Sequence, residues 1–248
     1  MDKRHKIYFA SDFHLGLAVE GSPIDREKRA VSWLTAAAVD AKEIYLLGDI
    51  FDFWWEYRNV VPKGFTRLLG TISSITDSGI SIHFFTGNHD LWVGAYLSEE
   101  CGMIIHKSPI TVTLNGKIFH LAHGDRLGSK NIGKNLISVL FRNKVLQKIY
   151  SALHPSIGIE IGQKWSQISS NVGQKEMENF KGEENEDLIR YAKAILSKEK
   201  IDYFIFGHRH LAMSYKLNSD CEILFLGNWI SSSNYGLWNG ENLSFVKF

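Results

Sequence analysis

Five short polar segments, each directly following an apolar run, constrain how this chain can fold. The apolar run at 44–47 leads through Gly48 into Asp49, so a strand made of that run would hold the Asp49 carboxylate at the carboxyl edge of a sheet. Open α/β sheets bind their ligands at this edge. We therefore expect one pocket, lined by Ser11-Asp12-Phe13-His14, Asp49-Ile50-Phe51-Asp52, Gly87-Asn88-His89-Asp90, His123-Gly124-Asp125 and Gly207-His208-Arg209-His210.

The first part of the chain alternates strand and helix patterns. Short apolar runs predict strands at 6–11, 44–47 and 80–85. Between them, apolar residues recur at helical spacing over 25–38, where Asp25 could cap the helix, and over 65–75, where Gly79 follows as a stop. This alternation is typical of a parallel α/β sheet.

Beyond residue 110 the pattern changes to hairpins and separate strands. Asn115-Gly116, between strand-like runs at 110–114 and 117–122, predicts a type I′ hairpin. A helix is expected at 187–196 and strands at 203–206, 222–226 and 243–248. The expected fold is an α/β sandwich with central mixed β-sheets flanked by helices. Residues 1–248 would form a single domain, because no linker divides the chain.

Composition narrows the class of protein. Hydrophobic residues make up 44% of the 248 residues and charged residues 22%, which is typical of a folded globular protein. No apolar run approaches the roughly 18 to 20 residues that span a bilayer, and residues 1–6 leave no room for a signal peptide before the first strand. With only Cys101 and Cys221, a disulfide framework is not expected, and the predicted location is the reducing cytoplasm.

Positive charge is concentrated in the middle of the chain. Residues 126–175 contain eight Lys or Arg against the single acid Glu160, a net charge of +7, which leaves 1 − 7 = −6 for the rest. Two interpretations stay open: an anionic partner, such as a phosphorylated ligand or an anionic membrane surface, or a solvated helical face. Nucleic acid is not expected, because the charge is confined to one segment. Nothing in the sequence indicates an obligate protein partner.

The side chains of the five segments are suited to metal binding. A mixed set of carboxylate, amide and imidazole ligands favours Mn, Fe or Zn over Mg alone. Two such ions, about 3.5 to 4 Å apart, can share one carboxylate and hold both oxygens of a phosphoryl displacement. Asp49 would be the shared carboxylate. Asp52 could accept a hydrogen bond from a ligand or be a loop residue, and the first is favoured. His83 and His120 fall inside strands and are expected to be packing or surface residues.

Taken in order, the five segments resemble those of the calcineurin-like metallophosphoesterases. The resemblance implies the fold of that family and two divalent metal ions bridged by Asp49. The implied ligands are Asp12, His14 and His210 on one ion and Asn88, His123 and His208 on the other. It also implies two catalytic residues outside the metal shell. His89 would donate to the leaving oxygen or to charge developing on phosphorus, and Asp90 would orient it.

The basic segment is expected to form a helical cap insertion at 126–180. Apolar residues from Leu136 to Leu153 recur at helical spacing, Pro155 would end that helix, and a second helix is expected at 157–165. Such a helical pair could admit a molecule with a phosphate and an acyl chain, or could be a lid that packs its apolar stripe on the core. The expected substrate-binding residues are Arg142, Asn143, Lys144 and Lys164.

Residues 140–146 and 152–155, together with Leu226-Gly227-Asn228-Trp229, resemble a narrower group, the UDP-2,3-diacylglucosamine diphosphatases of Gram-negative lipid A synthesis. This resemblance implies Mn as the metal, a helical cap that binds acyl chains, and peripheral association with the cytoplasmic face of the inner membrane. The implied reaction is attack of water on the diphosphate of UDP-2,3-diacylglucosamine, giving UMP and 2,3-diacylglucosamine 1-phosphate.

His89 departs from the narrower resemblance, because those diphosphatases more usually have arginine at this position. A histidine acid matters most for an alkoxide leaving group. The alternative is therefore a phosphomonoesterase or phosphodiesterase of the same fold that acts on a soluble phosphoester or nucleotide. A non-catalytic scaffold is less favoured, because the set of metal ligands is complete.

Overall fold

The structure is a computed structural model that describes residues 4–18, 22–129 and 141–248, with the backbone alone for 169–177. Two β-sheets form its centre. The larger sheet consists, in sheet order, of β11 (Leu243–Lys247), β10 (Asn234–Trp238), β1 (Lys6–Ala10), β2 (Ala41–Leu47), β3 (Ser81–Phe85) and β4 (Ile104–His106). The second sheet consists of β5 (Ile110–Leu114), β6 (Lys117–Ala122), β7 (Tyr203–Phe206), β9 (Glu222–Leu226) and β8 (Ala212–Lys216).

Strands β1 to β3 are parallel, as the alternation of strand and helix patterns predicts, and β4 is parallel to β3. They are connected by α1 (Pro23–Ala37), α2 (Thr66–Asp77) and the short α3 (Tyr96–Glu99). The first helix begins at Pro23 rather than at Asp25, because the proline ring suits the first helical position. Strand β10 is antiparallel to both β1 and β11, so the sheet is mixed.

The second sheet combines a parallel centre with two antiparallel edges. Strands β6, β7 and β9 are parallel, while β5 and β8 each pair antiparallel with a neighbour. The predicted hairpin at Asn115-Gly116 is confirmed. Both turn residues have positive φ, 49° and 80°, as a type I′ turn requires. The predicted mixed α/β architecture is therefore confirmed.

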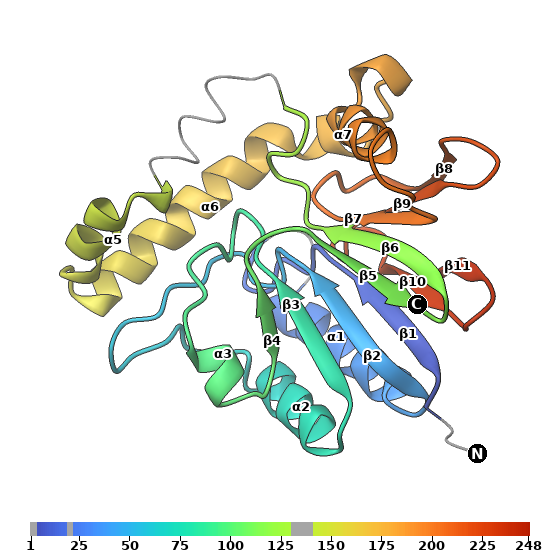
Figure 1. Ribbon diagram of the computed structural model, residues 1–248. Helices are drawn as coiled ribbons and strands as arrows, with labels where there is room; N and C mark the ends of the chain where they lie inside the picture. The colour runs from blue at the N-terminus through green and yellow to red at the C-terminus, as the bar shows by residue number, and fades with distance from the viewer. Residues whose placement is uncertain (1–3, 19–21, 130–140) are drawn as a thin grey trace.

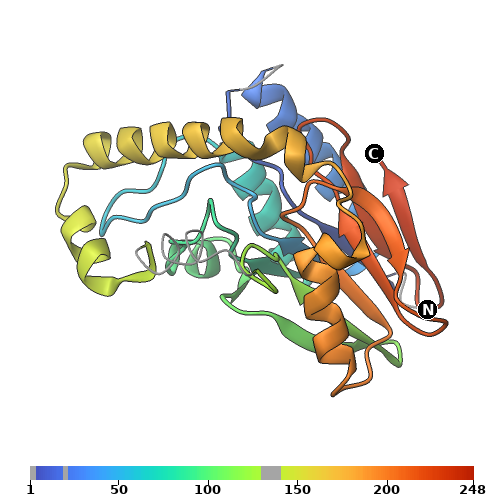
Figure 2. The ribbon, with the colours of Figure 1, turned by 90° about the horizontal axis from the view of Figure 1, so that it is seen from above.

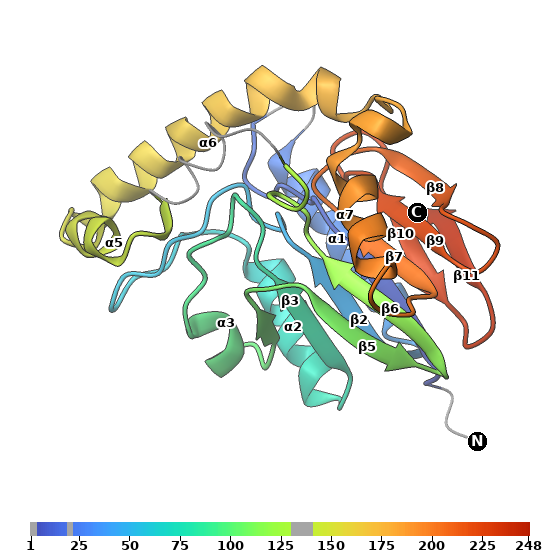
Figure 3. The ribbon, with the colours of Figure 1, turned by 45° about the horizontal axis from the view of Figure 1, so that its top comes forward.

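The elements form four layers (Figures 1 and 3). Side chains of α1 and α2, such as Trp33 and Ile72, pack on one face of the larger sheet. The two sheets pack face to face through residues such as Phe9 and Phe119. The outer face of the second sheet is covered by α7 (Asp187–Leu196), which follows a 3-10 turn at Glu183–Asn185.

Three strands, β4, β8 and β10, were not expected from the sequence. Strand β4 has only three residues, and β8 is an edge strand whose side chains are all at least partly exposed. Strand β10 contains Asn234 and Gly236, residue types that are uncommon in strands. These strands form because a neighbouring strand supplies their hydrogen bonds, and a local apolar pattern does not report such pairing.

Two helices, α5 (Lys144–Ser151) and α6 (Pro155–Met177), are the described part of the expected cap. The second helix was expected at 157–165 and is considerably longer, with Pro155 at its first turn rather than at the end of the preceding helix. Figure 2 shows α6 as one long helix across the top of the molecule. The expected apolar residues Leu136 and Leu140 lie outside the described residues, and the cap boundaries 126–180 stay a prediction.

Among the described residues, no helix combines the length and the apolar character that crossing a bilayer requires.

The N-terminus of α2 is capped by a side chain from α1. Glu27, which is buried, accepts hydrogen bonds from the backbone N–H groups of Arg67 (3.0 Å) and Leu68 (3.2 Å). No side chain from the helix's own N-cap position, Phe65, does so. A carboxylate at a helix N-terminus also interacts favourably with the helix dipole. Glu27 thus joins the two helices of this layer.

We expect Glu27→Ala to lower the free energy of unfolding by about 1 to 2 kcal/mol, because it leaves the buried N–H of Leu68 and the partly buried N–H of Arg67 without their acceptor. Urea unfolding followed by circular dichroism measures this change. Lys28→Ala, at the exposed neighbouring position on α1, is the control and should change the stability by less than about 0.5 kcal/mol. Equal effects of the two substitutions would contradict the capping role.

Candidate metal centre

The five polar segments follow five strands, as the sequence predicts. They come directly after β1, β2, β3, β6 and β7, and contacts between the segments of different sheets bring them together. The backbone N–H of His208 donates to Asp12 Oδ2 at 3.0 Å, and the backbone N–H of Trp229 donates to the carbonyl of Asp12 at 2.9 Å. The edges of the two sheets therefore meet at one site.

The backbone at this site is held in an unusual conformation. Eight non-glycine residues among those described have positive φ, and five of them are predicted metal ligands: Asp12, His14, Asp49, His208 and His210. Positive φ costs free energy for residues with a side chain, and such strain gathers at functional sites. The surrounding fold must therefore stabilise these loops in this conformation.

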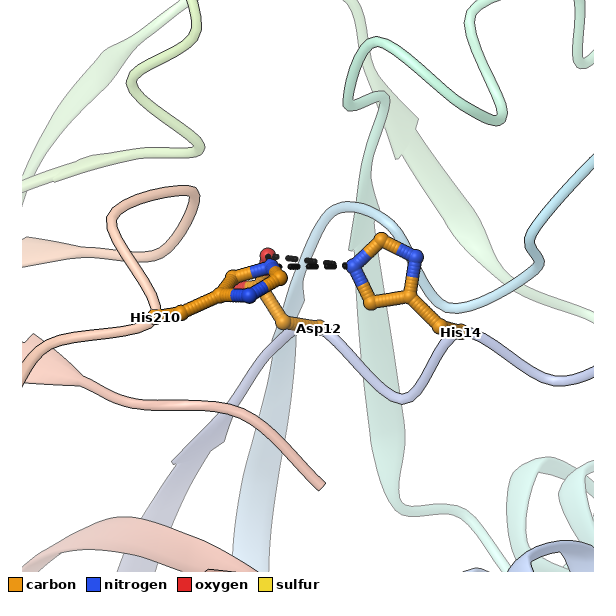
Figure 4. A group of neighbouring side chains, drawn as sticks. All are labelled: Asp12, His14 and His210. Carbon is orange, nitrogen blue, oxygen red and sulfur yellow. Dashed lines mark hydrogen bonds and ion pairs between the residues drawn. The ribbon is translucent and has the colours of Figure 1, made fainter. Parts of the chain in front are cut away.

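Asp12, His14 and His210 form one group of potential ligands (Figure 4). The Nε2 atoms of His14 and His210 lie 3.1 Å apart, and Asp12 Oδ1 lies 3.3 Å from His210 Nε2 and 3.7 Å from His14 Nε2. All three side chains are buried. Their donor atoms converge on one point from the loops after β1 and β7.

Asp49, His123 and His208 form a second group. Asp49 Oδ2 lies 3.3 Å from His123 Nε2, and Asn88 Oδ1 lies 3.4 Å from the same nitrogen. Asp49 Oδ2 is also 3.9 Å from His14 Nε2, which belongs to the first group. One oxygen of Asp49 therefore faces both groups, and the structure brings all seven predicted metal ligands together.

Partners outside the two groups orient the imidazole rings. His123 Nδ1 donates to the carbonyl of Leu47 at 2.8 Å, which leaves Nε2 to face Asp49. Asp52 Oδ1 lies 3.5 Å from His14 Nδ1, so this carboxylate supports the ring from the side away from Asp12. Neither of these two atoms has a hydrogen-bond partner among the described residues, so the expected hydrogen bond from a ligand to Asp52 stays a prediction.

The residues present fit divalent metal ions. Several buried polar atoms of the two groups have no hydrogen-bond partner among the described residues, including Asp12 Oδ1, His208 Nδ1 and His210 Nδ1. Burial by itself would raise the pKa of Asp49, but the neighbouring charges of His123 and His89 hold this pKa well below its ordinary value. Asp49 is therefore a carboxylate, as a shared metal ligand must be.

His89 lies beside the two groups, but Asp90 does not orient it as predicted. His89 Nδ1 lies 2.9 Å from the carbonyl oxygen of Asp52 and 2.6 Å from Ser166 Oγ. Its backbone N–H donates to Asp49 Oδ1 at 2.9 Å. The ring of His89 is thus held by Asp52 and by a residue of α6.

Asp90 instead joins the loops after β2 and β3. Its carboxylate is fully buried and accepts hydrogen bonds from the backbone N–H groups of Gly87 (2.7 Å), Ile50 (2.8 Å) and Phe51 (3.4 Å). Burial and, next, the negative charge of Asp49 raise the pKa of Asp90 to about 7. Asp90 therefore fixes the position of Asp49 relative to Asn88.

The four predicted substrate-binding residues lie on or next to α5 and α6. Arg142 is partly buried and Lys144 is exposed. The side chain of Asn143 caps α5, accepting from the N–H groups of Val145 and Leu146, and Lys164 pairs with Glu160 at 2.7 Å. Asn143 and Lys164 thus already have local structural partners. Contact of any of the four with substrate stays a prediction.

An aromatic cluster that sequence reasoning missed connects the cap to this site. Trp92 donates through Nε1 to the carbonyl of Phe141 at 2.9 Å and packs on Trp55 and Tyr150 of α5. The signal was present in the sequence, since Phe53-Trp54-Trp55 follows Asp52 and Trp92 lies two residues after Asp90.

The loops after β2 and β3 approach so closely that Gly87 has no room for a side chain. A Cβ at this position would lie 2.2 Å from Asp49 Oδ1 and 2.7 Å from the backbone nitrogen of Asp49. Gly87→Ala should therefore displace Asp49, and we expect bound metal to fall below half of the wild-type content and phosphoesterase activity to fall at least about tenfold.

Metal content by mass spectrometry, with circular dichroism as a check on folding, tests this expectation. Gly70→Ala is the matched control, because a Cβ there meets no atom within 4 Å. If Gly87→Ala bound as much metal as Gly70→Ala, Asp49 would not be a ligand whose position matters.

Comparisons with known proteins agree with this arrangement. The model of the calcineurin-like phosphoesterase family matches residues 5–212. A UDP-2,3-diacylglucosamine hydrolase from Porphyromonas gingivalis is 41% identical, and the alignment covers 97% of this chain and 96% of the relative. A UDP-2,3-diacylglucosamine hydrolase from Histophilus somni is 27% identical, with 90% of this chain and 92% of the relative covered.

Among solved structures, a dimetal phosphatase from Danio rerio matches with a TM-score of 0.50 and 13% identity, covering 98% of this chain and 95% of that one. At this identity the match supports the fold alone. The family match spans all five segments that form the site. The chain therefore belongs to the calcineurin-like phosphoesterase family and is a hydrolase that depends on divalent metal ions.

Proposed function

We propose that this protein hydrolyses the diphosphate bond of UDP-2,3-diacylglucosamine, giving UMP and 2,3-diacylglucosamine 1-phosphate. The observation that carries the proposal is an exposed apolar face on α5 and α6 beside two groups of potential metal ligands, both of which Asp49 faces. The similarity to the Porphyromonas gingivalis hydrolase, which extends over nearly the whole of both chains, supports the same substrate.

Seven residues would hold the metal: Asp12, His14 and His210 on one ion, Asn88, His123 and His208 on the other, and Asp49 between them. Two divalent ions, which we propose to be Mn, would activate water and neutralise charge on the phosphate oxygens. Imidazole ligands without sulfur suit Mn, and also Fe or Zn. Asp90 holds the loops that carry Asp49 and Asn88 at a fixed position relative to each other, and Asp52 orients His14.

His89 would stabilise charge that develops on the diphosphate. Its Nδ1 atom is occupied by the carbonyl of Asp52 and by Ser166, so Nε2 is the ring nitrogen left for the substrate. A phosphate ester can leave without receiving a proton. Because the Nδ1 proton is used by these acceptors, Nε2 can donate to a phosphate oxygen only when the ring is the doubly protonated imidazolium, and in that state the hydrogen bond and positive charge of His89 are sufficient for this reaction. The histidine can therefore serve where the related diphosphatases usually have arginine.

The apolar face of the cap would bind the acyl chains. Large hydrophobic side chains are exposed along both helices: Val145, Leu146, Ile149, Leu153, Ile157, Ile161, Trp165 and Ile168. Ile157, Ile161 and Trp165 recur every four residues and so lie on one side of α6, and an exposed apolar surface of this kind is typical of a binding site for an apolar partner. The exposed Lys144 and Lys148 on α5 would contact anionic lipid, and the proposal includes peripheral association with the cytoplasmic face of the inner membrane.

A second candidate function, hydrolysis of a soluble phosphomonoester or phosphodiester, is favoured by His89. A histidine acid is most useful when the leaving group is an alkoxide. In that case the apolar face would act only as part of a lid. The two candidates differ in whether the acyl chains contribute to binding.

We expect the Mn-loaded protein to release UMP from UDP-2,3-diacylglucosamine in detergent micelles with a kcat/KM at least about 100-fold above that for UDP-N-acetylglucosamine, which lacks the long acyl chains. Chromatographic quantification of UMP measures both reactions. Asp49→Asn is the inactive control and should lower the rate by at least about 100-fold. Equal turnover of the two nucleotide sugars, or cleavage of a soluble aryl phosphate alone, would favour the second candidate.

A further inference from the structure

A stripe of small residues brings α6 against the loop that follows β2. Among the described side chains of α6, the buried positions are Gly158, Gly162 and Ser166, spaced four residues apart on one face of the helix. A Cβ at Gly158 would lie 1.8 Å from Tyr57 Oη, and one at Gly162 would lie 2.2 Å from the ring of Phe53. The helix therefore lies directly on residues 53–57, with Ser166 next to Asp52.

Ser166 makes two short hydrogen bonds at the end of this stripe. It is 4% exposed, and its Oγ donates to the carbonyl of Asp52 at 2.6 Å. The same oxygen lies 2.6 Å from His89 Nδ1, which in turn lies 2.9 Å from the Asp52 carbonyl. A residue of the cap thus contacts a predicted catalytic residue that is 77 positions away in the sequence.

The hydrogen-bond donors and acceptors determine which ring nitrogen of His89 carries a proton here. A carbonyl oxygen only accepts, and the single hydroxyl hydrogen of Ser166 is used in the bond to Asp52. Both neighbours of His89 Nδ1 are therefore acceptors, so Nδ1 is protonated and donates to them. The ring cannot rotate without breaking these bonds, and Nε2 is presented to the substrate.

The position of Ser166 is set by contacts at both ends of the cap. At the α5 end, Trp92 binds the carbonyl of Phe141. Beyond the other end of α6, Asn228 donates to Glu178 at 3.1 Å, and Arg209 donates to the carbonyl of Asn179 at 2.9 Å. Arg209 lies between the predicted ligands His208 and His210. The segment that follows α6 is therefore hydrogen-bonded to the loop that carries two of the predicted ligands.

We propose that Ser166 is a positioning residue for the phosphoester reaction: through its hydroxyl, the cap helix holds the His89 imidazole in the orientation that presents Nε2 to the substrate. The cap then has a second role besides binding acyl chains. This inference rests on the proposed role of His89 in catalysis, and it extends that role to a residue that does not itself contact the reacting atoms.

The test is a double-mutant cycle with the Mn-loaded full-length protein. Ser166→Ala, His89→Ala and the double variant are compared for kcat and KM on UDP-2,3-diacylglucosamine and on p-nitrophenyl phosphate. We expect Ser166→Ala to lower kcat about tenfold and to leave KM unchanged. In the His89→Ala background the same substitution should have no further effect on kcat, because Ser166 acts only by orienting the His89 imidazole. Ser156→Ala, at an exposed serine of the same helix, is the matched control and should leave kcat unchanged.

Three results would overturn the inference. The first is an unchanged kcat in Ser166→Ala. The second is a rise in KM alone, which indicates that Ser166 contacts the substrate. The third is an equal loss of kcat with His89 present and with His89→Ala, which indicates general structural damage. Metal content and circular dichroism identify damage of that kind independently of activity. Absence of UMP release by the wild-type protein would instead refute the proposed substrate, and the cycle on p-nitrophenyl phosphate would still test Ser166.

Discussion

The site depends on compensating the charge of two buried carboxylates, Asp12 and Asp49. They are 0% and 2% exposed, and an isolated carboxylate is costly to bury. Histidines from four different loops surround them, and the pKa of each carboxyl is held below its ordinary value by these neighbours, despite burial. Hydrogen bonds and ion pairs between these loops hold their backbone in place, which explains how the chain tolerates five predicted ligand residues with positive φ. Divalent ions between the same groups would complete this compensation.

The cap is more closely connected to the core than an accessory lid would need to be. Its long helix α6 lies on residues 53–57 through two glycines, contacts His89 through Ser166, and continues to Glu178 and Asn179, which bind the loops carrying Asn228 and Arg209. The exposed apolar face lies on the same two helices. An acyl chain bound there would therefore contact elements that also hold His89, the proposed catalytic histidine.

The sequence was sufficient to predict the parallel strands, the hairpin and the five polar segments that converge at the strand ends. These depend on local features, namely apolar runs, helical spacing and polar residues directly after a strand, whereas the seven ligands within the segments are implied by the family resemblance. The sequence was not sufficient where a contact between distant segments decides the role of a residue. Asp90 stands next to His89 in the chain, but the backbone N–H groups of two loops surround its carboxylate. Ser166 is one serine among several in a helix, and only the fold brings it to His89.

We propose that two divalent ions share Asp49, and anomalous diffraction at the Mn edge from crystals grown with MnCl₂ would show whether they do. We expect two anomalous peaks about 3.5 to 4 Å apart, on either side of Asp49, with Asp12, His14 and His210 around one peak and Asn88, His123 and His208 around the other. A single peak, or a peak coordinated by His89, would contradict it.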